Sequence, residues 1–294
     1  MSPDNPSPLP HAHAPLFALP CHSVLALQGP DAVAFAQAQF ANDVARLAVG
    51  HWQWSAWLTA KGRVIAVFAL LRSGEDTLHL VLPDFDAGEL GDALRRFVFR
   101  RKVVITAQAD LVVAAAFAAP LQASGDRLAG DLADGEGLEL DYGTAGLPRR
   151  LRLGRTAAPA DLEAAQAWAV ADLRLGLPRL PGSQRELWTP QQLALDRLAA
   201  FSVSKGCYPG QEIVARTHFL GKAKRELLLL QVEEAAQAGD EVHQAGVAIG
   251  KLASVAGHNP RWALGVLPLE RDDTPLQAGQ APALPQPILQ GLAR

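Results

Sequence analysis

The chain has 294 residues, of which 49% are hydrophobic and 19% are charged. This balance is typical of a globular protein and excludes a disordered chain, and the length allows one large domain or two to three smaller ones. Its 27 basic and 30 acidic residues leave a net charge of −3, so no excess of positive charge draws it to nucleic acid or to an anionic membrane.

Other classes of protein are excluded by residue patterns. The two cysteines, Cys21 and Cys207, lie far apart and frame neither a disulfide scaffold nor a metal site, and the eight histidines show no paired spacing. No uncharged apolar stretch reaches 18 residues, and the Pro-rich tail over 1–15 lacks the features of a secretory signal. We predict a cytoplasmic protein in a reducing compartment, without a metal site and with a disordered tail.

Residues 16–120 predict an α+β domain. The apolar run 23–27 ends at Gly29-Pro30-Asp31, where a proline and an acidic residue favour the start of a helix that would reach Phe40. Two strands, a helix and two further strands are then expected, at 63–72, 77–82, 84–99, 103–106 and 111–117. Strand, helix, two strands, helix and strand is the order of a ferredoxin-like split βαβ unit.

Residues 121–221 predict a second α+β domain. Its first part, 122–160, is rich in Gly, Ala and Asp and is expected to form a loop-rich connection with short strands. Apolar residues at three- and four-residue steps predict a helix over 162–175, which ends before Pro178. From residue 222 to 294, strand-like runs separated by turns predict a small β-barrel; they lie at 226–232, 247–255 and 262–268.

The most informative segment is 205–216, with the sequence KGCYPGQEIVAR. Gly206 and Gly210 permit a positive φ and the proline between them fixes its own φ, so we expect Cys207 to sit on a tight turn. Lys205 precedes the thiol by two residues, and the Arg216 side chain would reach back toward the thiol if a helix began near Gln211. Nearby cations favour the reactive thiolate. A buried cysteine with a purely structural role is the alternative.

This segment, Lys-Gly-Cys-Tyr-x-Gly-Gln-Glu followed by Ala-Arg, resembles the signature of the YgfZ-type folate-binding proteins, which are relatives of the aminomethyltransferase of the glycine cleavage system. Further similarity extends from about residue 22 to 270, at segments 28–32, 39–44, 57–63 and 174–178. The resemblance implies an aminomethyltransferase-like ring of α+β and ferredoxin-like domains around a folate-binding opening, with a C-terminal β-barrel. It also implies a monomer.

The resemblance further implies a site for tetrahydrofolate or a derivative. Trp168 lies where the family places a folate-contacting Trp, although its spacing alone fits a core aromatic equally well. His22 stands where some relatives carry another such Trp. The remaining candidate folate-binding residues lie close to Trp168 in sequence or within the cysteine motif: Glu186, Trp188, Tyr208, Gln211 and Glu212.

The resemblance to this family implies that the chain is an accessory protein. Such a protein would support assembly or repair of iron–sulfur clusters in client enzymes, including those of tRNA thiomodification. Cys207 would be the functional thiol, poised by Lys205 and Arg216.

Two alternatives stay open. One is a folate-dependent aminomethyltransferase or demethylase, in which Asp84 or Asp86 would serve in place of those enzymes' aspartate. The other is a partner-binding scaffold with a structural folate. Nucleic-acid contact is not expected, because the basic cluster Lys222, Lys224 and Arg225 lacks interleaved aromatics.

Overall fold

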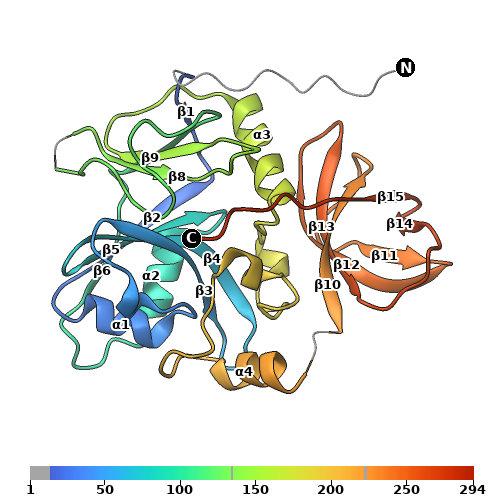
Figure 1. Cartoon of the computed structure of the whole chain (residues 1–294), viewed down its shortest axis with the longest axis horizontal. Coiled ribbons are helices and arrows are strands. Elements are labelled where there is room, and N and C mark those ends of the chain that lie inside the picture. Colours follow the sequence, from blue (N-terminus) through green and yellow to red (C-terminus); the bar gives the residue numbers. More distant parts are fainter. Residues whose placement is uncertain (1–13, 134, 222–223) are drawn as a thin grey trace.

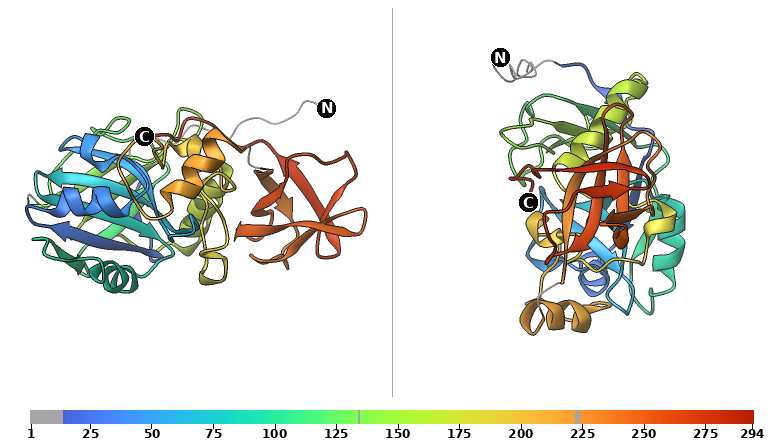
Figure 2. Two further views of the ribbon diagram at one scale, coloured as in Figure 1. Left: turned by 90° about the horizontal axis from the view of Figure 1, so that it is seen from below. Right: turned by 90° about the vertical axis from the view of Figure 1, so that its right-hand side faces the viewer.

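The computed structural model describes residues 14–133, 135–221 and 224–294, which form two open β-sheets and one closed β-barrel (Figure 1). The sheets lie at one end of an elongated molecule and the barrel lies at the other, with helix α3 (Leu162–Arg174) between them (Figure 1, Figure 2). The tail predicted over 1–15 falls almost wholly outside the described residues, as does Lys222 of the basic cluster.

The first sheet is antiparallel and has five strands. Its order is β3 (His51–Leu58), β4 (Val64–Gly74), β5 (Thr77–Pro83), β2 (His22–Gln28) and β6 (Val104–Ala107). Helices α1 (Ala32–Gln39) and α2 (Ala87–Arg95) cover one face with buried apolar side chains. The order β4-β5-β2-β6 confirms the predicted split βαβ unit. Strand β3 was not expected, because nearly all its residues are buried and no in–out alternation marks it.

The second sheet has the order β1 (Phe17–Ala18), β7 (Val112–Ala116), β9 (Arg150–Gly154) and β8 (Leu138–Asp141). Strands β8 and β9 are the short strands expected within 122–160. Helix α3 begins where Asp161 accepts a hydrogen bond from the Ala164 amide, as an N-cap does. One continuous core lies between this sheet, the open face of the first sheet and α3.

The predicted barrel is confirmed as six antiparallel strands that close on themselves. They are β10 (Arg225–Val232), β13 (Arg261–Pro268), β12 (Val247–Ala256), β11 (Glu241–Gln244), β14 (Leu276–Ala278) and β15 (Ala281–Gln286). The chain then runs back from the barrel to the two sheets (Figure 1), where the Trp54 indole donates to the carbonyl oxygen of Leu292 at 2.8 Å.

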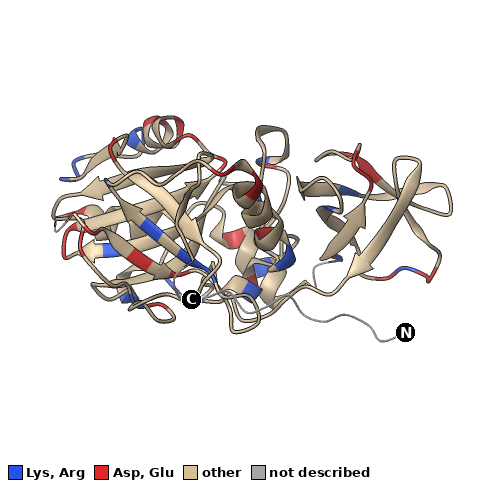
Figure 3. Ribbon diagram, turned by 90° about the horizontal axis from the view of Figure 1, so that it is seen from above, with Lys and Arg blue, Asp and Glu red and all other residues tan. Residues whose placement is uncertain are grey.

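Charged residues of both signs are distributed over both sheets and the barrel (Figure 3). Among the described residues, no helix is long and apolar enough to cross a membrane.

Candidate functional site

The cysteine motif forms a loop that is fixed by its own side chains. We call residues 202–210 the Cys207 loop; it leads into helix α4 (Gln211–Phe219), which begins at the expected residue. The Tyr208 hydroxyl donates to the carbonyl oxygen of Ser202 at 3.1 Å, and the side-chain amide of Gln211 donates to the carbonyl oxygen of Lys205 at 3.0 Å. The Cys207 thiol is exposed, so the loop presents it to solvent.

Lys205 anchors this loop to helix α1. Its side chain is buried, and its ammonium donates to the carbonyl oxygens of Gln37, Phe40 and Asn42 at 2.6, 2.5 and 2.9 Å. Burial lowers the pKa of Lys205 to about 8. The three donors of the ammonium are thus directed at the end of α1, and the contact that Lys205 makes with the motif is with the ring of Tyr208, at 4.9 Å.

Two glycines bring the motif against the turn between β3 and β4. Gly210, the N-cap of α4, has φ +79°, and Gly62 in the turn has φ +68°. Gly206 lies outside the left-handed region, so only one of the two motif glycines uses a positive φ. The turn carries the Lys61-Gly62-Arg63 element that the sequence resemblance included, so the fold places two resembling segments side by side.

Glu186 and Trp188 lie along the start of β4, beside this turn. The Glu186 amide donates to the carbonyl oxygen of Val64, and the Val64 amide donates to that of Trp188, both at 2.8 Å. Arg216 and Glu212 are exposed on α4. The start of β4, the turn before it and the N-terminus of α4 thus lie together at one end of the first sheet.

A cavity of about 430 Å³ lies where the two sheets, α3 and the barrel meet. We call it the central cavity. Its lining comes from the segment before β2, the end of β5, α3, the segment after α3 and the turn between β12 and β13; it includes Leu19, Cys21, His22, Asp84, Leu162, Arg179 and Arg261. A pocket of this size and position is typical of a small-molecule site.

His22 and Asp84 are the sequence-predicted residues that line the central cavity. His22 is the candidate for folate contact. Both of its ring nitrogens are shielded from solvent and have no hydrogen-bond partner among the described residues. Burial, together with the charges of Arg179 and Arg149, lowers the pKa of His22 well below its ordinary value. The ring is therefore neutral and offers one donor and one acceptor.

A chain of four charged side chains ends at this cavity; three are buried and the last, Asp84, is partly exposed. The Arg149 guanidinium donates to Asp172 at 2.6 Å, and both side chains are fully buried. Arg179 donates to the other Asp172 oxygen at 2.9 Å and to both oxygens of Asp84, one of them at 2.7 Å. Asp84 has a positive φ of 57°, a conformation that is strained for a non-glycine residue and is frequent at functional sites.

Trp168 lies behind this chain of charges. It is fully buried, with its ring stacked on Tyr142 at 5.7 Å and the Arg149 guanidinium 4.4 Å from its centroid. The sequence-predicted folate residues therefore fall in three places: His22 at the central cavity, Trp168 in the core, and the remainder near the Cys207 loop.

The sequence reasoning did not identify Asp172 and Arg179 as site residues. The sequence does carry a signal at Asp172, which is an acidic residue four positions after Trp168 and therefore lies on the same, buried face of α3. Among the described residues, no cluster of His, Cys, Asp or Glu has the geometry to hold a metal ion.

The sequence of this chain was compared with those of known proteins, and several relatives match most of its length. The chain matches no protein-family model. An uncharacterised protein of Haemophilus influenzae is 30% identical over 226 residues, which cover 75% of each chain. The tRNA-modifying protein YgfZ of Serratia proteamaculans is 29% identical over 249 residues, covering 78% of this chain and 74% of that one. The corresponding protein of Sodalis glossinidius is 27% identical over 256 residues, covering 80% and 78%.

Among solved structures, the glycine cleavage system aminomethyltransferase T from Bartonella henselae matches with a TM-score of 0.70. The match covers 96% of this chain and 86% of that one at 19% identity. The chain therefore has the aminomethyltransferase-like fold with a C-terminal barrel that its sequence predicted.

Proposed function

Since the chain belongs to the family of the tRNA-modifying protein YgfZ, we propose that it is a folate-binding accessory protein that supports tRNA modification. The finer part of the proposal is that it acts by maintaining iron–sulfur clusters in client enzymes, as the family resemblance of its cysteine motif implied. The observation that carries the folate part is the central cavity, with a neutral His22 whose ring nitrogens have no partner among the described residues.

The lining of the central cavity fits a reduced folate. A pterin is a flat ring that needs apolar faces and a few polar partners at its edge. Leu19 and Leu162 supply apolar surface, while His22 and the Asp84 carboxylate supply a donor and acceptors. Arg261 brings positive charge to the wall, which suits the anionic glutamate end of folate. When bound, folate would supply one-carbon or redox chemistry to this site.

Cys207 is the proposed working thiol. It is exposed at the surface, and the internal hydrogen bonds of its loop fix its position. A single thiol cannot hold a cluster as multi-cysteine sites do, so in this proposal the cluster or its metal is cargo that Cys207 shares with a client. Arg216 on α4 remains the proposed cation for the thiolate, and Lys205 acts by anchoring the loop.

One comparison favours this accessory role over carbon transfer, because the named relatives that cover about three quarters of the chain are called tRNA-modifying proteins. Both carboxylate oxygens of Asp84 accept hydrogen bonds from Arg179, so Asp84 also has a structural partner within the chain.

The test separates folate binding from thiol function. Titration calorimetry with tetrahydrofolate under anaerobic conditions is expected to show binding to the wild type and to Cys207→Ser. Binding to His22→Leu is expected to be about tenfold weaker, the effect of losing one hydrogen bond of about 1.4 kcal/mol. Equal affinity of the His22 variant, with the fold intact, would contradict the assignment of the cavity.

The second arm uses cells that lack the gene. Wild type is expected to restore the thiomodified nucleosides of tRNA, whereas Cys207→Ser, present at equal abundance, is not. If Cys207→Ser rescued fully, the scaffold alternative with a structural folate would replace the proposal. One-carbon transfer from an amine donor to folate in vitro would instead support the transferase alternative.

A further inference from the structure

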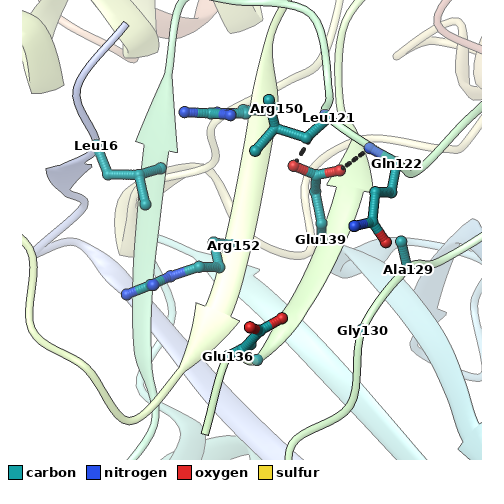
Figure 4. Close-up of a pocket in the computed structure, with 10 residues that line it drawn as sticks. Leu16, Leu121, Gln122, Ala129, Gly130, Glu136, Glu139, Arg150 and Arg152 are labelled. Atoms are coloured by element: carbon teal, nitrogen blue, oxygen red, sulfur yellow. Dashed lines mark hydrogen bonds between the residues drawn. The ribbon is translucent and has the colours of Figure 1, made fainter. Parts of the chain in front are cut away.

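A second cavity, of about 340 Å³, lies on the face of the second sheet that is turned away from the core (Figure 4). It is formed over β8 and β9 by the segment at Leu16 and by the loops around residues 121 and 129. It has no lining residue in common with the central cavity, so it is a separate site.

Two arginines from one strand line this cavity. Arg150 and Arg152 alternate along β9 with Leu151 and Leu153, which lie in the core, so both guanidinium groups lie on the cavity side. Arg150 is only 8% exposed. Arg150 donates to the carbonyl oxygen of Ala14 at 3.0 Å, and Arg152 donates to that of Thr156 at 2.8 Å. The Nε of each is shielded from solvent and has no partner among the described residues.

The carboxylates opposite these arginines are bonded elsewhere. The strand register pairs Arg152 with Glu139 and Arg150 with Asp141, positions from which carboxylates ordinarily neutralise a guanidinium. Glu139 instead accepts from three successive loop amides, those of Leu121, Gln122 and Ala123, at 3.1, 2.8 and 2.9 Å. The first two of these bonds are drawn in Figure 4. Asp141 accepts from the Gly125 amide at 3.0 Å and lies 3.6 Å from Arg294.

We propose that this cavity binds a small organic anion, with its carboxylate or phosphate group held by Arg150 and Arg152. Their Cα atoms stand about 7 Å apart on one strand face, so the two guanidinium groups repel each other until an oxyanion lies between them. Their planar donor forks match the oxygens of either group. Leu16 and Leu121 provide apolar surface for the carbon skeleton of the ligand.

The two carboxylates in the lining, Glu136 and Glu139, limit the negative charge that the ligand can carry. Glu136 is the one that can be removed without disturbing the loop amides bound by Glu139. The Glu136 side chain lies in the wall near Arg152 (Figure 4) and is exposed. A carboxylate there disfavours additional negative charge. A ligand of low charge is therefore a better occupant than a polyanion such as RNA, and the proposal does not depend on the function assigned to the central cavity.

The experiment compares four probes on the full chain by titration calorimetry: acetate, benzoate, inorganic phosphate and phenyl phosphate, in chloride buffers of equal ionic strength. We expect benzoate or phenyl phosphate to bind at least tenfold more tightly than its counterpart without the ring, and the tighter of the two identifies the head group. Arg152→Gln is expected to weaken that binding at least tenfold. Arg155→Gln is the matched control, because Arg155 is exposed and bonded to Asp110, and it is expected to bind as wild type does.

A second variant keeps the proposal testable if Arg152→Gln does not fold. Glu136→Gln removes a carboxylate from the exposed wall and is expected to tighten binding of the same probe two- to fivefold. The proposal is overturned if no probe binds above the chloride baseline, if Arg152→Gln binds like Arg155→Gln, or if Glu136→Gln leaves the affinity unchanged.

Discussion

Gly210 lies so close to Gly62 that a Cβ atom on Gly210 would stand 2.6 Å from the Cα atom of Gly62. The same Cβ would stand 2.6 Å from the carbonyl oxygen of Thr59. This contact joins the N-terminus of α4 to the turn between β3 and β4. The position of the Cys207 loop therefore depends on two backbone segments that approach each other without side chains between them.

Gly210→Ala is expected to lower the free energy of unfolding by about 2–3 kcal/mol, because alanine disfavours the positive φ and its methyl group clashes with backbone atoms that cannot move aside. Urea unfolding at pH 7 measures the loss. The rate at which Cys207 reacts with a thiol reagent is also expected to change, since the loop must shift.

Gly206→Ala is the matched control, since Gly206 has a φ outside the left-handed region and no atom lies within 4 Å of the place that an alanine methyl group would take. We expect a change within about 0.5 kcal/mol. An equal loss for both variants would mean that the close approach to Gly62 is not the cause.

Removal of the Asp172 carboxylate tests the buried chain of charges. Asp172→Asn leaves Arg149 without its fully buried partner and weakens the hold on Arg179. We expect a loss of about 3–5 kcal/mol of stability, as for breaking one side of a buried ion pair. Asp110→Asn breaks a pair whose two side chains are each 57% exposed, and it is expected to cost less than about 1 kcal/mol. Similar losses for the two variants would contradict the structural role of the buried chain.

Local patterns predicted much of the fold. Apolar spacing and turn residues located α1, α3, the hairpin of β4 and β5, and the main strands of the barrel. The patterns failed where a strand is buried on both of its faces or where a strand is short. Strand β3 carries three tryptophans without alternation, and β15 contains two prolines, which sequence rules assign to strand edges or to loops.

The candidate site was harder to predict because its contacts join distant segments. The motif located Cys207 and the helix that follows it. It could not reveal that Lys205 bonds to carbonyl groups at the end of α1, which precede it by more than a hundred positions in the chain. Likewise, Asp84, Asp172 and Arg179 form no sequence motif. They meet only in the fold, where the segment after α3 carries Arg179 to both the residue that follows β5 and the residue on α3.

Stability is expected to fall as the pH is lowered from 6.5 to 4, in part because of His79. Burial lowers the pKa of His79 from 6.5 to about 4, so between these values the unfolded chain binds a proton that the folded chain does not. This residue alone accounts for a loss of about 3 kcal/mol by pH 4. Urea unfolding of wild type and His79→Asn at pH 7 and pH 4 measures it, and the variant is expected to lose less stability over that interval.

His258→Asn is the control for this measurement, because the His258 side chain is 58% exposed. It should retain the wild-type dependence on pH. A His79 variant that lost as much stability as the wild type on acidification would show that other groups cause the effect.

The segment after the barrel is expected to stabilise the packing of the two sheets through the buried side chain of Leu292. That side chain is 2% exposed, and its carbonyl oxygen accepts the Trp54 indole hydrogen bond. Leu292→Ala keeps the backbone bond and removes the buried side chain, so a loss of about 2–4 kcal/mol is expected. Leu269→Ala, at a position that is 50% exposed, is expected to change stability by less than about 0.5 kcal/mol. Thermal unfolding followed by tryptophan fluorescence compares the two, and a Leu292 variant as stable as the Leu269 variant would mean that this segment adds nothing to the packing of the sheets.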